Sequence, residues 1–295
     1  MPLETFLIIA SFVFGCVWGS FFNVAIYRLP RGMSLVRPGS HCFSCNAPIA
    51  WYDNVPLVSW LVLRGRCRRC GAPFSFRYFV VELVSGLLFA AVMMKYVTAV
   101  TTKGHVLAGA AAVILHWLLV GGFVVLTFID FDHKIIPDCV TIPGMILGLI
   151  ASFAVPALVA RYPASPAGTT HLQGLLLHGL IGLLVGGGII WVIAVLGKAA
   201  FKKEAMGGGD LKLMAMIGAY MGWQLVLLVL FLAALVGTLV GVSLIVARRA
   251  AWSSQIPFGP YLVLGALIAF FFGPELIGWY FGLFHPMPEP ISLLF

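Results

Sequence analysis

The sequence predicts an all-α polytopic membrane protein, with about eight transmembrane helices and a small cytoplasmic insert between the first two. Of its 295 residues, 61% are hydrophobic and only 9% are charged. The mean hydropathy is +1.06. Soluble domains carry about 25% charged residues, so this class of protein is excluded. Apolar runs of the length that a bilayer requires, roughly 20 residues, also recur along the chain.

These apolar runs define the expected helices. Single crossings are expected for the runs at residues 5–27, 78–98, 105–129, 139–160, 172–197 and 255–274. The uncharged run 213–247 is too long for one ordinary crossing, because a helix rises about 1.5 Å per residue. We therefore expect it to hold a short crossing and a full one, divided near Gly222. The total is then about eight crossings.

Positive charges in the loops predict the orientation. Residues 28–77 contain eight arginines and a single acidic residue. Positively charged loops stay in the cytoplasm, so this segment is expected inside and the N-terminus outside. The lysines at 198–203 then also fall inside, as do Arg248 and Arg249 if residues 213–247 cross twice. This bias and contact with anionic lipid of the bilayer explain the net charge of +8, and we expect no nucleic-acid partner.

The chain divides into three parts. Residues 1–27 form the first transmembrane helix, residues 28–77 form the cytoplasmic insert, and residues 78–295 form a membrane-embedded bundle. The insert is the only sizeable polar piece, so it is expected to fold outside the bilayer.

Two C-x-x-C pairs lie in the insert. Cys42 pairs with Cys45 and Cys67 with Cys70, and 21 residues separate the pairs. Four thiolates at this spacing are typical of one structural, tetrahedral Zn²⁺ site, and turn-forming Asn46 and Gly71 follow the pairs. Disulfides or a redox C-x-x-C are the alternatives, but cytoplasmic thiols stay reduced. A segment with so little core needs such a metal to fold.

Acidic residues gather at the cytoplasmic end of the third helix. The stretch FIDFDHKIIPD (128–138) contains Asp130, Asp132 and Asp138, and Asp210 begins a later apolar run. Ionisable residues at membrane depth are costly and usually functional. Asp130 directly follows its apolar run and so lies deepest of the first three. If it meets Asp210, one carboxyl group can hold a proton while the other acts as a base toward a water molecule.

The residues alone leave more than one function open. Two paired carboxylates hydrolyse peptides in aspartic proteases, but a transporter would use Asp130 and Asp210 as a proton or cation site. Transporter sites favour the middle of the bilayer, whereas these acids lie at one face. A structural role for the acids, or a zinc-bearing assembly factor without catalysis, is also compatible with the pattern.

The neighbours of the two carboxylates are expected to have supporting roles. They are Asp132, Asp138, Lys212 and the glycines Gly207, Gly208 and Gly209. Asp132 lies about 200° around a helix from Asp130 and so points away from it. Asp138 follows Pro137 in the first turn of the next helix, where an acid is favourable. The glycines permit backbone conformations closed to other residues and let another chain approach, while the Gly-Lys-Ser/Thr ending of a nucleotide loop is absent.

Six ordered motifs resemble those of one family. They are GSFFNVAIYRLP (19–30), the double C-x-x-C with NVPLVSWL (54–61) between its pairs, RYFVVEL (77–83), FIDFDHKIIPD (128–138), GGGD (207–210) and IPFGPYL (256–262). With them the chain closely resembles the type IV prepilin peptidase family, the bifunctional leader peptidases and N-methyltransferases of pilus and type II secretion systems. The resemblance covers nearly the whole chain.

This resemblance implies a function. Asp130 and Asp210 match the catalytic aspartates of the family. The family cuts the basic leader from prepilins or pseudopilins at the cytoplasmic face of the bacterial inner membrane. It then methylates the new N-terminus with S-adenosylmethionine. The insert is shorter than in many members, between Pro30 and Pro38, and no glycine-rich S-adenosylmethionine motif is visible. Glu82, a charge inside the second helix, is a candidate for the methyl-transfer site, with a snorkelling or helix-pairing role as the alternative.

Overall fold

The fold is helical throughout the part of the chain that the structure describes. The structure, a computed structural model, describes residues 1–102, 105–154, 170–202, 207–247 and 257–284. These ranges contain no β-strand, only two isolated bridges, His41 to Pro48 and Arg66 to Pro73. The predicted all-α fold class is therefore confirmed for them. Lys203, Arg248 and Arg249, on which the predicted orientation partly depends, lie outside the described residues.

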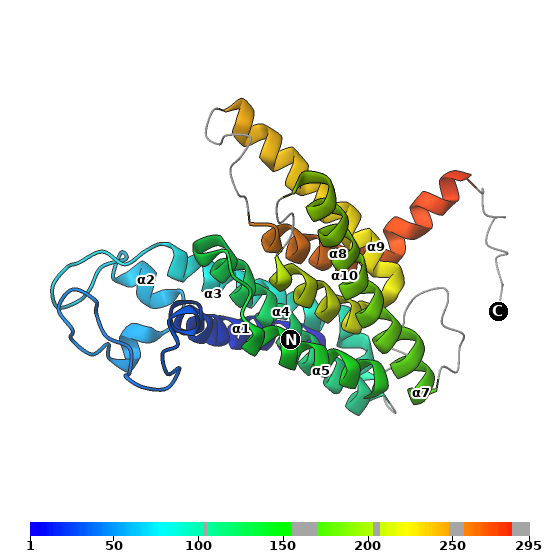
Figure 1. Cartoon of the computed structure of the whole chain (residues 1–295). Coiled ribbons are helices and arrows are strands. Elements are labelled where there is room, and N and C mark those ends of the chain that lie inside the picture. Colours follow the sequence, from blue (N-terminus) through cyan, green and yellow to red (C-terminus); the bar gives the residue numbers. More distant parts are fainter. Residues whose placement is uncertain (103–104, 155–169, 203–206, 248–256, 285–295) are drawn as a thin grey trace.

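Long apolar helices dominate the structure (Figure 1). They are α1 (Leu3–Arg28), α3 (Arg77–Thr101), α4 (Val106–His133), α5 (Asp138–Ala154), α8 (Ile181–Phe201), α9 (Gly208–Val246) and α10 (Gly259–Phe284). The short α7 (His171–Gln173) and the π-helix η3 (Gly174–Leu180) extend α8 at its start. By length and composition, 6 helical stretches in the described ranges can cross a membrane, and α5 is a shorter apolar helix. The count of eight crossings stays a prediction.

The helix α9 is broken where the sequence predicted a division. Gly222 has φ 76° and ψ 166°, which is not helical, although the helix continues on both sides of it. A Cβ atom at this position would lie 2.5 Å from ring atoms of His178, so both the backbone conformation and the packing require glycine. The break predicted near Gly222 is therefore confirmed as a kink.

The helices pack in two groups that meet at α4. On one side α1 packs along α3, and on the other α5, α8 and α10 pack against α9. In the most apolar stretch of α4, 67% of the residues are buried, against 22% to 39% in the other long helices, so α4 is central. Small residues let α1 and α3 approach closely, since a Cβ atom on Gly19 would lie 2.6 Å from the Cα atom of Glu82.

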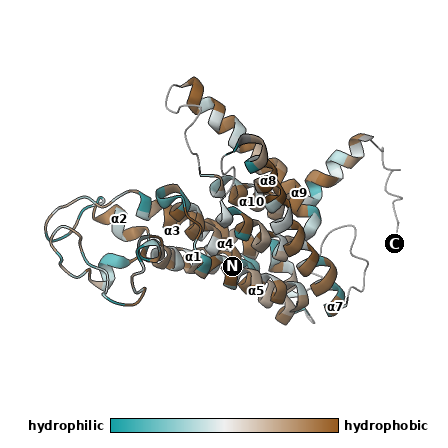
Figure 2. Ribbon diagram, in the orientation of Figure 1, coloured by the Kyte–Doolittle hydropathy of each residue, from teal (hydrophilic) through white to brown (hydrophobic). Residues whose placement is uncertain are grey.

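The insert between α1 and α3 forms one end of the molecule (Figure 1). It contains the 3₁₀ helices η1 (Leu29–Arg31) and η2 (Trp51–Asn54) and the short helix α2 (Val58–Val62). Hydrophobic residues predominate along the bundle, while the insert is more hydrophilic (Figure 2). The buried guanidinium group of Arg28 fixes the insert to the end of α1, because it donates hydrogen bonds to the carbonyl oxygens of Ser34 and Pro38, at 2.9 and 2.6 Å.

Candidate active site and metal centre

Asp130 lies in the last turn of α4. Its side chain is only 5% exposed. The helix ends at Lys134, which adopts the left-handed conformation and donates its backbone N–H to the carbonyl oxygen of Asp130, at 2.9 Å. The carboxylate Oδ2 of Asp130 accepts a hydrogen bond of 3.1 Å from the backbone N–H of Gly259, the first residue of α10. The end of α4 and the start of α10 therefore fix this carboxyl group together.

Asp210 lies in the first turn of α9, and it is half-buried. Its Oδ2 accepts a hydrogen bond of 3.3 Å from the backbone N–H of Gly207, which caps the helix start. Gly209, the neighbour of Asp210, and Gly259, which is bonded to Asp130, both pack against Ile136. The end of α4 and the starts of α9 and α10 therefore converge, which brings two residues 80 positions apart in the sequence to one region.

Close packing around Ile136 explains one of the predicted glycines. A Cβ atom on Gly209 would lie 2.8 Å from the Cβ atom of Ile136. Gly208 has no atom within 4 Å of such a Cβ position, and Gly207 meets only Asp210 Oδ2 and Gly209 N, at 3.7 and 3.9 Å. None of the three has a positive φ, so the backbone conformations that only glycine permits are not adopted here. The expected close approach of another part of the chain is present only at Gly209, against Ile136.

Close packing also requires glycine at position 259. The motif IPFGPYL contains Gly259, but it was not predicted as a site residue. A Cβ atom on it would lie 2.6 Å from Oδ2 of Asp130 and 3.2 Å from Cδ1 of Ile136. The available signal was the Phe-Gly-Pro sequence before the last long apolar run.

Three of the predicted supporting residues, Asp132, Asp138 and Lys212, take part in two ion pairs near these carboxylates. Asp132 pairs with Arg77, the first residue of α3, whose other nitrogen Nη2 donates to the carbonyl oxygen of Phe128 at 3.2 Å. Asp138 lies in the first turn of α5 as predicted, and Lys212 of α9 binds it at 2.7 Å. Neither pair includes Asp130 or Asp210. Each pair contains a residue that follows one of these aspartates by two positions in the sequence.

The four cysteines of the insert come together. Their sulfur atoms all lie within 4.8 Å of one another. The two pairs lie in separate turns with the same hydrogen bond. Cys42 donates its backbone N–H to the carbonyl oxygen of Ala47 at 2.9 Å, and Cys67 donates to that of Ala72 at 2.8 Å. Asn46 and Gly71 have φ values of 54° and 72°, as expected for residues that turn the chain around a metal ligand. The donor set and its spacing fit a tetrahedral metal ion.

The electrostatics of the cysteines favour a bound cation. The backbone N–H groups of Cys45 and then of Ser44 hold the pKa of the Cys42 thiol well below its ordinary value, at about 6. At Cys70 the backbone N–H of Ala72 lowers the pKa, but burial and the neighbouring thiols outweigh it and raise the pKa to about 11. Four sulfur atoms this close cannot all ionise unless a positive charge binds them.

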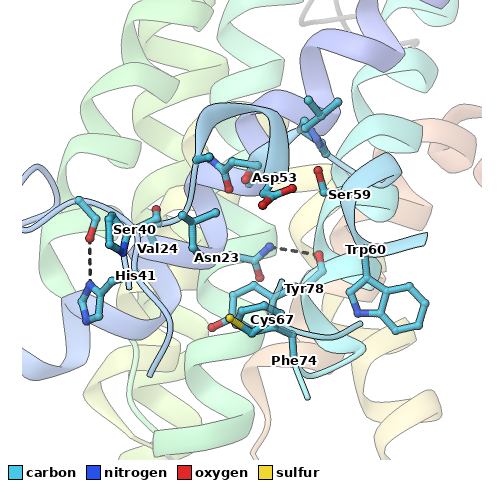
Figure 3. A pocket seen from close by; sticks show the side chains of 18 of the residues that line it. Asn23, Val24, Ser40, His41, Asp53, Ser59, Trp60, Cys67, Phe74 and Tyr78 are labelled. Carbon is cyan, nitrogen blue, oxygen red and sulfur yellow. Dashed lines mark hydrogen bonds between the residues drawn. The ribbon is translucent and has the colours of Figure 1, made fainter. Parts of the chain in front are cut away.

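Glu82 lies elsewhere, in a cavity of about 1030 Å³ between α1, α3 and the insert (Figure 3). Its side chain is 9% exposed, and its Oε2 accepts a hydrogen bond of 2.8 Å from the backbone N–H of Leu57. Asn23, 8% exposed, donates its Nδ2 to the carbonyl oxygen of Tyr78 at 3.1 Å. Trp60 also lines the cavity. Asn23 and Trp60 belong to the motifs quoted above, but their grouping depends on how the insert folds over the helices.

Two family descriptions match the chain. Residues 13–96 match the bacterial peptidase A24 N-terminal domain, and residues 117–242 match the type IV leader peptidase family. The first match covers the later part of α1, the cysteine insert and most of α3, and the second includes Asp130, Asp210 and both ends of the Asp138–Lys212 pair.

Curated relatives are similar over most of the chain. The chain is 37% identical to a prepilin leader peptidase/N-methyltransferase of Aeromonas hydrophila, covering 91% of this chain and 92% of the relative. It is 32% identical to one of Pseudomonas aeruginosa, covering 95% and 98%, and 39% identical to one of Myxococcus xanthus, covering 81% and 64%. No solved structure was found to match the chain.

Proposed function

Because the chain belongs to the type IV leader peptidase family, we propose that it removes the leader of prepilins or pseudopilins and then N-methylates the product. The observation that supports the peptidase assignment is the position of Asp130 and Asp210 at helix ends that converge on Ile136. A transporter favours carboxylates near the middle of the bilayer, whereas Asp130 and Asp210 lie at the ends of helices that are long enough to span it.

The two aspartates divide the work of hydrolysis. If the two carboxyl groups come together around a substrate, they share one proton, since both charges together are unfavourable. The ionised member takes a proton from a water molecule, which attacks the scissile carbonyl carbon. The protonated member donates its proton to the departing amine, so protons balance over the cycle. Gly207 and Gly259 each bind one carboxylate oxygen, Oδ2, and in this mechanism Oδ1 of each residue faces the water.

The charges favour cleavage at the cytoplasmic face of the inner membrane. Lys134 and Lys212 lie at the helix ends that carry the aspartates, and Arg77 at the start of α3 pairs with Asp132 beside Asp130. Positive residues are retained on the cytoplasmic side. If α5 and the two parts of α9 each cross the bilayer, the helices of the described residues make eight crossings. The N-terminus then lies outside, and the substrate presents an apolar helix from the bilayer.

A zinc ion is proposed for the four cysteines, with a structural role. Four thiolates complete a tetrahedral shell and leave no position for a substrate. The matching turns around Cys42 and Cys67 support this set of ligands. S-adenosylmethionine is the proposed methyl donor, supported by the N-methyltransferase names of the relatives.

Substitution of either aspartate tests the peptidase assignment. In purified full-length protein, Asp130→Asn and Asp210→Asn should each lower the rate of leader removal by about a hundredfold or more, because a general acid or base is lost. Exposed Glu275 in α10 provides the control, and Glu275→Gln should cleave like the wild type. Mass spectrometry of a prepilin substrate measures the rate. Cleavage at the wild-type rate by either aspartate variant would refute the assignment.

A further inference from the structure

The short helix α2 of the insert turns its apolar side chains outward. Val58, Leu61 and Val62 are 54%, 58% and 68% exposed. Because they are three and four residues apart, they lie on one face of the helix. Ser59 and Trp60 lie on the other side, are partly buried and line the cavity described above. A helix of a soluble domain buries its apolar face, so the exposed face of α2 marks a surface that an apolar partner covers.

Two contacts hold α2 against the start of α3. The ring of Trp60 packs on those of Phe76 and Phe79, with centroids at 5.2 and 5.5 Å (Figure 1). The backbone N–H of Leu57, directly before α2, donates a hydrogen bond of 2.8 Å to Oε2 of Glu82. Glu82 is the sixth residue of α3 and so lies about 7.5 Å along its axis from the helix start. Since α3 is long and apolar enough to cross a membrane, α2 lies at the depth where α3 enters the bilayer.

Positive charges directly follow the apolar face. Arg64 and Arg66 are exposed, and their backbone N–H groups donate to the carbonyl oxygens of Leu61 and Leu63, at 3.2 and 3.0 Å. Both arginines therefore lie at the end of α2. Within the described ranges neither forms an ion pair, and the one acidic residue of the insert, Asp53, is paired with another arginine. An apolar face beside unpaired positive charge is complementary to a bilayer surface with anionic headgroups.

We propose that α2 is a membrane-surface anchor of the insert, whose apolar face enters the leaflet around the start of α3 while Arg64 and Arg66 bind anionic lipid headgroups. Helices that lie in the plane of a membrane bury their apolar face about 5–10 Å below the headgroups, which agrees with the depth of Glu82 in α3. Phe76, which contacts Trp60 and is itself exposed, adds an aromatic ring of the kind that is enriched at this boundary. A protein partner would have to displace lipid at this depth, so the bilayer is the occupant.

Photochemical cross-linking from the outward face identifies what covers it. Full-length protein with Leu61→benzoylphenylalanine is placed in vesicles of equal parts phosphatidylglycerol and phosphatidylcholine and irradiated, and mass spectrometry identifies the adducts. Lipid adducts should exceed those of a Ser44→benzoylphenylalanine control by about tenfold or more, because Ser44 is exposed in the turn of the first cysteine pair and not on α2. Val58→benzoylphenylalanine probes the same face from the other end of α2 and should match the Leu61 variant, so a folding defect in one variant does not decide the result.

The role of the arginines is tested in the same vesicles. In the Leu61→benzoylphenylalanine background, Arg64→Gln with Arg66→Gln should lower the preference of the adducts for phosphatidylglycerol over phosphatidylcholine by about threefold or more, because each arginine near the surface attracts anionic lipid. Arg37→Gln with Arg69→Gln removes the same charge from two exposed positions away from the end of α2 and should keep the original preference.

Three results would overturn the anchor. Lipid adducts no more frequent from Leu61 and Val58 than from Ser44 would place α2 outside the bilayer. Adducts with a second copy of the chain, or with a prepilin added to the vesicles, in place of lipid would show that a protein covers this face. An equal loss of headgroup preference in both arginine double variants would mean that net charge, and not the end of α2, attracts the lipid. None of these results depends on leader removal, so the proposed peptidase function is judged separately.

Discussion

Two ion pairs stand two residues along the chain from the proposed catalytic acids. Asp132 follows Asp130 and pairs with Arg77, and Lys212 follows Asp210 and pairs with Asp138. The members of both pairs are 31% to 55% exposed, so each pair contributes little to stability. Their positions suggest another use: each fixes a helix end that carries one carboxylate against a neighbouring helix.

Removal of the charge of Lys212 tests this positioning role. Lys212→Met should slow leader removal by about three- to tenfold, because small displacements of reacting groups are costly, while the free energy of unfolding changes by less than about 1 kcal/mol. Lys212→Arg keeps the charge and should recover most of the rate. Cleavage kinetics beside thermal unfolding in detergent measure both effects. A slow Lys212→Met with a slow Lys212→Arg would argue for a role of the amine other than the ion pair.

At this scale the sequence predicted acids better than their partners. Asp130 was distinguishable because it ends a long apolar run, where a charge is costly. Arg77 was not, because a basic residue at the start of a membrane helix already has a topological explanation. Its contact with Asp132 joins residues 55 apart in the chain and depends on how α3 packs beside α4.

Helix ends form the aspartate site, and glycine lets them approach. Gly209 of α9 packs against Ile136, which lies in the connection between α4 and α5, and Gly259 of α10 packs against both Ile136 and Asp130. The same run also contains Gly208, which has open space around it. Within the glycine motif, Gly209 therefore leaves no room for a side chain, whereas Gly208 does.

Alanine substitutions test this inequality. Gly209→Ala and Gly259→Ala place a methyl group 2.8 and 2.6 Å from existing atoms, so the helix ends must separate and leader removal should fall by about tenfold or more. Gly208→Ala is the matched control within the same turn and should cleave nearly like the wild type. Prepilin cleavage kinetics compare the three. Equal activity of Gly208→Ala and Gly209→Ala would show that close packing is not the reason for the motif.

For the whole molecule, the sequence pattern predicted the helices and the cysteine cluster, but not the cavity. The apolar runs predicted the long helices, and the length of the uncharged run 213–247 predicted the break at Gly222. The C-x-x-C spacing gave the four-cysteine cluster. The cavity beside Glu82 was not predictable, because it arises from the insert lying over α1 and α3, and no periodicity encodes that placement.

The cavity beside Glu82 and the two aspartates lie in different parts of the chain. The cavity is lined by the insert, including Cys67, whereas both aspartates lie on the bundle, in α4 and α9. The described part of the insert has few buried apolar residues, among them Cys42 and Ala47, so we expect its fold to depend on the proposed metal. Loss of the metal should therefore damage the cavity first.

Replacement of Cys42 and Cys67 by serine tests this dependence. Native protein should contain about one zinc ion per chain, and the double variant should contain none, since two thiolates cannot complete a tetrahedral shell. Leader removal should fall by less than about tenfold, because removing the metal unfolds the insert but leaves the helix ends around Asp130 in place. Elemental analysis and product mass spectrometry on one preparation measure the zinc content and the cleavage. A larger loss of cleavage would show that the insert also supports the aspartates, and Arg77, which follows the insert and holds Asp132, would be the connection.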